Sequence, residues 1–117
     1  MNVTELAEAV LQGDLLAARQ WAADAQRLEI QWSELDRPVR LDARALRIAA
    51  GLVELLAGRA GAEPPSWTNE IGGGEEMIVL DPGLELMPRS FAHAKTSAPE
   101  PLRRRNLVAL PDFLQVA

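Results

Sequence analysis

ARALRIAAGLVELLAGRAG, residues 43–61, is the stretch that decides the fold of this chain. Its apolar residues recur at helical spacing on two adjacent faces, one marked by Leu46 and Val53 and the other by Ile48 and Leu55. A helix that is apolar around most of its circumference is buried in a globular protein. We therefore predict that this stretch is the central helix of the domain.

Both ends of this helix carry signals for where it starts and stops. Asp42 is placed to cap its first turn. Gly61 is placed as the left-handed terminator, and Pro64–Pro65 prevent continuation. Gly51 in the middle costs about 1 kcal/mol relative to alanine, so we expect another helix to approach closely at this point.

Two further helices are predicted before the central one. Asn2 is expected to cap a helix over about residues 4–12, which ends at Gly13. Asp14 starts the second helix, LLAARQWAADAQRLEI, residues 15–30. Its expected core positions form two adjoining stripes: Leu11, Leu15, Ala18, Ala22 and Ala25, and then Trp21, Ala25, Leu28 and Trp32. The two tryptophans are expected to pack in the core against alanines.

From residue 62 onward the chain changes character, with frequent prolines and three consecutive glycines. Only short elements fit between them. We expect short strands over 77–80 and 107–110, one or two helical turns kinked near Pro88, and a short helix ending near Asn106. Ser97-Ala-Pro-Glu100 matches the capping signature that would start this last helix.

The predicted fold is therefore a mostly α single domain, residues 1–117. Residues 1–61 form a small bundle of about three helices. Residues 62–117 form a proline-rich, irregular half of short helices with one short β pair. The apolar residues of this second half are too many for a disordered tail, so it is expected to pack on the helical half or on a partner.

Composition narrows the function classes. The chain of 117 residues has a net charge of −5 and no cysteine. Acidic charge is unfavourable for binding nucleic acid, and the absence of cysteine excludes disulfides, thiolate catalysis and zinc ribbons. The first residues lack a basic region before their apolar stretch, and no apolar run approaches the roughly 18 residues of a membrane span. A cytoplasmic protein without membrane contact is expected.

The candidate catalytic and ligand-binding motifs are weak. IGGGEE, residues 71–76, lacks the lysine and hydroxyl residue of a phosphate loop, and its glutamates would repel phosphate, so we interpret it as a flexible connector. His93 is the only histidine. It could serve a small enzyme together with Ser90 or Ser97, but neither serine stands in a nucleophile-elbow pattern. A single histidine also gives no usable metal site. We predict no catalytic residue, metal or cofactor.

The run Arg103, Arg104 and Arg105 has three interpretations. Successive helical residues turn by about 100°, so the three side chains fan around the axis instead of lining one stripe. They could oppose the helix dipole and bind acids of the first half, for example Glu29, Glu34 or Asp36. They could also contact a protein partner or, less favourably, nucleic acid. A second arginine set shares one helical face: Arg40, Arg44 and Arg47.

These observations favour a non-catalytic protein-interaction module in the cytoplasm. The residues predicted to contact its partner are Trp67, Arg103, Arg104, Arg105, Phe113 and Leu114. Two alternatives stay open: a nucleic-acid-binding protein that uses either arginine set, and a small enzyme that uses His93. Self-association is a further possibility, since an alanine-rich helix can pair with its own copy.

Two segments also carry a resemblance. LRIAAGLVELLAGRAGAEPPSWT (46–68) and PEPLRRRNLVALPDFLQVA (99–117) resemble a group of small uncharacterised bacterial proteins. Their shared features are a helix ending before PPxWT and a terminal P-x-x-x-RRR…P-x-FL. Members lie beside nucleotidyltransferase-type or other toxin-like genes, which implies an antitoxin-like companion role and no catalytic residues. In the segment GGGEEMIVLDPG (72–83) this chain departs from the group's pattern, so no function located there is implied.

Overall fold

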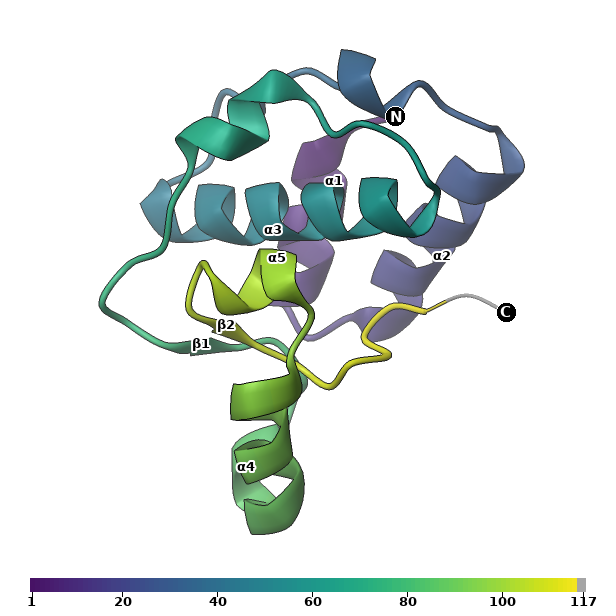
Figure 1. Ribbon diagram of the computed structural model, residues 1–117. Coiled ribbons are helices and arrows are strands. Elements are labelled where there is room, and N and C mark those ends of the chain that lie inside the picture. Colours follow the sequence, from purple (N-terminus) through teal and green to yellow (C-terminus); the bar gives the residue numbers. More distant parts are fainter. Residues whose placement is uncertain (116–117) are drawn as a thin grey trace.

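The computed structural model describes residues 1–115 of the chain. Within this range it contains five α-helices, three short 3-10 helices and two short strands (Figure 1). The α-helices are α1 (Val3–Leu11), α2 (Leu15–Arg27), α3 (Ala43–Arg59), α4 (Pro88–Ser97) and α5 (Glu100–Arg103). The remaining elements are η1 (Trp32–Glu34), η2 (Ser66–Glu70), η3 (Leu84–Leu86), β1 (Ile78–Val79) and β2 (Leu107–Val108). The mostly α fold predicted from the sequence is confirmed.

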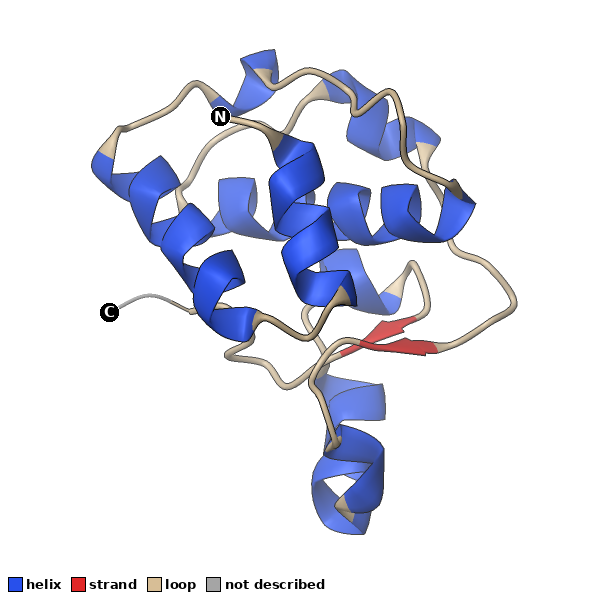
Figure 2. Ribbon diagram, turned by 180° about the vertical axis from the view of Figure 1, so that it is seen from behind, coloured by secondary structure: helices blue, strands red, loops and turns tan. Residues whose placement is uncertain are grey.

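Helix α3 is the central element, as predicted. The carboxylate of Asp42 accepts a hydrogen bond from the Ala45 N–H at 2.8 Å, and Gly61 ends the helix region at φ +68°. Eleven of its residues are buried, on nearly every side. Figure 2 shows α1 crossing α3 steeply, while α5 lies against the opposite side of α3. None of the helices in residues 1–115 is long and apolar enough to cross a membrane.

Helices α1 and α2 form the rest of the helical half. The side chain of Asn2 accepts a hydrogen bond from the Thr4 N–H at 2.8 Å, and that of Asp14 accepts one from the Ala17 N–H at 3.1 Å. Both predicted caps are therefore present. Helix α1 packs against both α2 and α3, so that the three helices share one core.

Helix α2 is shorter than predicted. It ends at Arg27, because Glu29 adopts the left-handed backbone conformation, with φ +49°. Trp32 therefore reaches the core from η1, where its ring lies 6.2 Å from that of Trp21. Leu11 and Leu28, which the periodicity placed in the core, are instead 42% and 55% exposed. Both of these residues stand at a helix end, where the periodicity no longer describes the direction of a side chain.

The two predicted strands pair, in parallel. Ile78 lies opposite Leu107, and Val79 lies opposite Val108. Parallel strands cannot be joined by a tight turn and need a long crossover connection. Here the crossover contains η3, α4 and α5, and α4 extends away from the body of the molecule (Figure 1).

Two expectations for this crossover were wrong. Pro88 does not kink a short helix but is the first residue of the ten-residue α4, a position that tolerates proline because the first N–H of a helix has no intrahelical acceptor. Ser97 does not cap α5 but is the last residue of α4. Helix α5 begins after Pro99 without a side-chain cap.

The irregular half packs on the helical half at Gly51. A Cβ atom at this position would lie 2.8 Å from a methyl carbon of Leu107 and 3.1 Å from one of Leu102. The close neighbours are side chains of β2 and α5, so a helix approaches Gly51 as expected, together with a strand. Both leucines are at most 1% exposed, and they belong to the same hydrophobic core as the residues of α1, α2 and α3.

We predict opposite effects for the same substitution at two glycines of α3. A Cβ atom at Gly58 would meet no atom within 4 Å, so Gly58→Ala should stabilise the protein by about 0.5–1 kcal/mol through lower chain entropy. Gly51→Ala should instead be less stable than Gly58→Ala by about 1–3 kcal/mol, because the buried leucines must shift. Urea denaturation of both variants tests this, and equal stabilities would contradict the packing at Gly51.

Candidate functional site

The arginine run does not form one surface, because Arg105 is fully buried. Its Nε donates to the Ile71 carbonyl at 3.0 Å, and its Nη2 donates to the Thr68 carbonyl at 2.7 Å. Its Nη1 donates to the Pro101 carbonyl at 2.8 Å and to the Glu54 carboxylate at 3.0 Å. One guanidinium thus connects η2, α5 and α3. The role of Arg105 is structural.

The other two arginines flank this buried connection. Arg104 makes an ion pair with the second carboxylate oxygen of Glu54. Arg103 donates to the Thr96 carbonyl at 2.9 Å and ties α5 to the end of α4. The sequence suggested acids of the first half, Glu29, Glu34 or Asp36, as partners for the run. The partner is Glu54, the one acid inside α3.

Three other predicted contact residues lie in the core. Trp67 is 8% exposed and donates from its indole N–H to the Leu35 carbonyl at 2.9 Å. Phe113 is 3% exposed and Leu114 is 1% exposed. Trp67, Phe113 and Leu114, together with Arg105, therefore offer almost no surface to a partner in this fold. Among the predicted contacts, only Arg103 and Arg104 are exposed.

The main apolar surface that the sequence analysis missed is on the segment from η3 to α4, residues 84–97, which we call the arm. At the junction of the two helices, Leu86 is 81% exposed and Met87 is 49% exposed. The arm has a small core of its own, in which Leu84 and Ala94 contact Val108 of β2. The signal in the sequence was the pair of apolar residues directly before Pro88, which is the first residue of α4.

The base of the arm contains a perturbed carboxyl group. Asp81 follows β1, and its side chain accepts a hydrogen bond from the Leu110 N–H at 3.0 Å. Burial raises the pKa of Asp81, and the nearby Asp112 carboxylate raises it further, while the Leu110 hydrogen bond and Arg19 oppose the shift. The folded protein therefore holds a proton on Asp81 more tightly than the unfolded chain does.

His93 lies on the exposed side of α4. Its Nδ1 is 3.3 Å from the Ser97 hydroxyl, one turn later in the same helix. Within residues 1–115, no carboxylate is hydrogen-bonded to the ring, and His93 lines neither of the two pockets described below. The pair thus lacks the orienting acid and the enclosed site that a catalytic serine and histidine require.

The second arginine set, like the first, does not form a stripe. Arg40 precedes α3 in an exposed bend, and Arg44 pairs with the Glu76 carboxylate at 3.1 Å. Arg47 is only 7% exposed. The shared helical face inferred from the sequence is therefore divided between solvent and core, and it offers no continuous surface for a phosphate backbone.

The glycine-rich segment is closely packed instead of being a free connector. A Cβ at Gly73 would lie 3.1 Å from the Arg104 carbonyl oxygen, and one at Gly74 would lie 3.0 Å from the guanidinium of Arg47. The Asn106 amide also donates to the carbonyls of Gly74 and Glu75, at 3.1 and 3.2 Å. Glycines 73 and 74 allow this segment to lie against α3 and α5.

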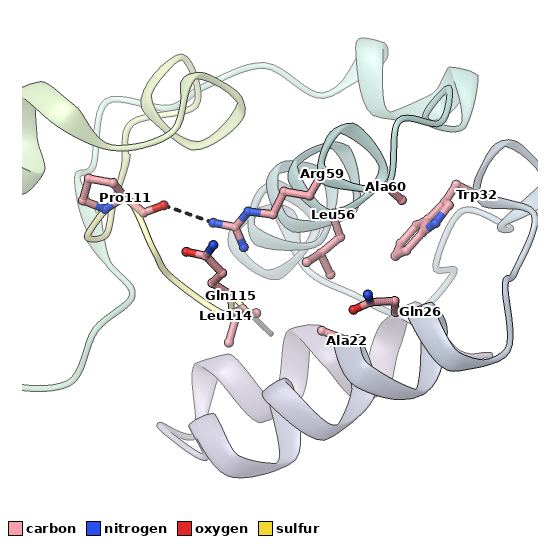
Figure 3. Close-up of a pocket in the computed structure, with 9 residues that line it drawn as sticks. All are labelled: Ala22, Gln26, Trp32, Leu56, Arg59, Ala60, Pro111, Leu114 and Gln115. Atoms are coloured by element: carbon pink, nitrogen blue, oxygen red, sulfur yellow. Dashed lines mark hydrogen bonds between the residues drawn. The ribbon is translucent and has the colours of Figure 1, made fainter. Parts of the chain in front are cut away.

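A pocket of about 450 Å³ lies between α2, α3 and the last described residues (Figure 3). Arg59 donates to the carbonyls of Pro111 and Phe113, at 3.1 and 2.6 Å. Burial lowers the pKa of Arg59, against the opposing effect of Asp112. The other lining residues are Ala22, Gln26, Trp32, Leu56, Ala60, Leu114 and Gln115. As far as residues 1–115 show, the lining holds no acid, histidine or hydroxyl group, and its polar side chains are those of Arg59, Gln26 and Gln115.

The chain matches no protein-family model, and no similar protein was found among curated proteins or solved structures. The resemblance noted in residues 46–117 therefore stays a prediction.

Loss of the Glu54 charge should destabilise the fold. Glu54→Gln leaves the buried Arg105 without its carboxylate, which should lower the free energy of unfolding by about 3 kcal/mol. Glu63→Gln is the matched control, because Glu63 makes no ion pair within the described range. It should change stability by less than about 0.5 kcal/mol. Urea denaturation distinguishes the two, and a Glu54→Gln variant as stable as the control would contradict the role given to Arg105.

Asp81 should make stability fall as pH rises. A raised folded-state pKa stabilises the protein below about pH 4, and this contribution is lost as the pH rises through the raised value. Asp81→Asn keeps an oxygen acceptor for the Leu110 N–H but has no charge. The stability of the variant relative to the wild type should therefore increase between about pH 4 and pH 7, measured by urea denaturation. If the difference in stability between variant and wild type does not change with pH, the Asp81 carboxyl group has the same pKa in the folded and the unfolded protein.

Proposed function

We propose that this chain is a non-catalytic protein-interaction module that binds its partner through the arm. The observation that supports this proposal is the exposure of Leu86 and Met87 at the junction of η3 and α4, in a segment that stands away from the body (Figure 1). Exposed apolar side chains that lie next to each other on a protruding element are typical of binding sites.

The charge of the arm indicates what the partner offers. Arg89 and Lys95 against Glu85 give residues 84–97 a net charge of +1 with His93 neutral, in a chain whose net charge is −5. Lys95 lies 4.7 Å from the ring centroid of Phe91, so the cation covers an aromatic side chain on the same helix. The complementary partner surface is an apolar groove with carboxylates at its edge.

The resemblance of residues 46–68 and 99–117 adds a class of partner to this proposal. If the chain is an antitoxin-like companion, the partner is a toxin-like enzyme of the nucleotidyltransferase type. Arg103 and Arg104 lie next to the end of α4 along the chain and are exposed. Arg103 donates to the Thr96 carbonyl and so adds a positive charge at the end of α4, whereas Arg104 is paired with Glu54.

Affinity capture tests the proposal with a matched pair of variants. The tagged wild-type protein should recover a specific partner from lysate of its native cell. The double variant Leu86→Glu/Met87→Glu should bind that partner with an affinity at least about tenfold lower, because one buried leucine side chain alone contributes about 1.5–3 kcal/mol. Leu16→Glu should retain it, since Leu16 is 78% exposed on α2, outside the arm.

Two results would argue against this function. In the first, the wild-type protein is recovered alone and sediments as a monomer. In the second, the arm variant and the Leu16 variant lose the partner equally. A homodimer that the arm substitutions dissociate would identify a second copy of the chain as the partner.

A further inference from the structure

Arg47 is a buried cation without a carboxylate partner. It is 7% exposed, and in residues 1–115 no acid lies within ion-pair distance of its guanidinium. Its Nη1 donates to the carbonyls of Glu76 and Arg105, at 2.8 and 3.2 Å. Two carbonyl dipoles offset only part of the cost of burying a charge. Since no fully buried side-chain nitrogen in the described residues lacks a partner, the nitrogens of Arg47 without hydrogen bonds are still reached by solvent.

The other edge of the guanidinium is free. Within the described part of the chain, Nε and Nη2 of Arg47 have no hydrogen-bond partner, since both of its hydrogen bonds come from Nη1. The Nε–Nη2 edge presents two parallel N–H groups, which match the two oxygens of a carboxylate. This edge belongs to a residue that lines a second pocket, of about 470 Å³, between the first half of α3 and the glycine segment.

The charges around this pocket leave one positive charge unmatched. Arg44 pairs with Glu76 at 3.1 Å, and Arg37 pairs with Glu70 at 3.3 Å. Both glutamates line the pocket, and each already has its own arginine. Arg37 lies outside the pocket lining, which holds two arginines and two glutamates, and of the lining arginines Arg47 is the one without an acid at ion-pair distance in the described residues. The pocket is therefore suited to one negative charge, and a ligand with several would meet the two glutamates.

The remaining walls are apolar or lack side chains. Ala43, Leu46 and Ile71 supply the apolar contacts, and the glycines of the segment supply backbone. A ligand with a short hydrocarbon body could cover these side chains while its charged end reaches Arg47. Each CH₂ group that the ligand buries there would strengthen binding further, because apolar surface is removed from water.

From these observations we infer that the pocket between α3 and the glycine segment binds a small organic monocarboxylate, whose two oxygens pair with Nε and Nη2 of Arg47. The site is separate from the arm, and the inference does not rest on the proposed function.

Thermal unfolding of the purified full chain tests this inference. Sodium acetate, butyrate and hexanoate are titrated at constant ionic strength and constant pH, with sodium chloride as the balancing salt. The melting temperature should rise in a saturable manner, and the apparent dissociation constant should fall from acetate to hexanoate. Inorganic phosphate should stabilise less than butyrate, because of its higher charge. No saturable rise with any carboxylate, or an equal rise with phosphate, would overturn the inference.

Two sets of variants locate the site. Arg47→Gln should weaken butyrate binding by about tenfold or more, because it removes a charge-assisted pair of hydrogen bonds. If this variant does not fold, Gly72 provides a second test, since a Cβ there meets no atom within 4 Å. Gly72→Asp should weaken binding by adding a carboxylate at the pocket, whereas the uncharged Gly72→Asn should bind as the wild type does. If Gly72→Asp and Gly72→Asn bind butyrate equally well, the carboxylate of the ligand does not bind in this pocket, and the inference is overturned.

Discussion

The structure depends on the buried guanidinium of Arg105. Its hydrogen bonds to three backbone carbonyls and one carboxylate join η2, α5 and α3, which are elements from both halves of the chain. The irregular half has little regular backbone pairing of its own, since its strands contain two residues each. The planar guanidinium of Arg105, with its five donors, thus fixes the relative positions of these elements, as the strands of a larger sheet would in other folds.

The elements that the sequence predicted well are those in which local signals and burial agree. Helix α3 has an apolar circumference, the Asp42 cap and the Gly61 terminator, and all three are present. The end of α2 and the start of α5 were predicted wrongly, because they depend on tertiary structure. The left-handed Glu29 and the position of Ser97 inside α4 are stabilised by surroundings that no local pattern encodes.

The candidate sites were harder to predict than the fold. An arginine in a sequence carries no sign of whether its partners are backbone carbonyls, and carbonyls account for most of the bonds of Arg105 and all those of Arg47. The charge pattern therefore suggested surface contacts where the side chains are internal. Leu86 and Met87 were missed because an apolar pair in the sequence does not show whether its side chains are exposed, and here both are.

The parallel pairing of β1 with β2 has an evolutionary consequence. The strands close the crossover at its base, and the arm beyond them is stabilised by its own small cluster around Leu84 and Ala94. Substitutions, insertions or even replacement of residues 85–93 leave the contacts of the central core untouched. The chain is thus divided into a body constrained by its packing and an appendage whose residues can vary without disturbing that packing.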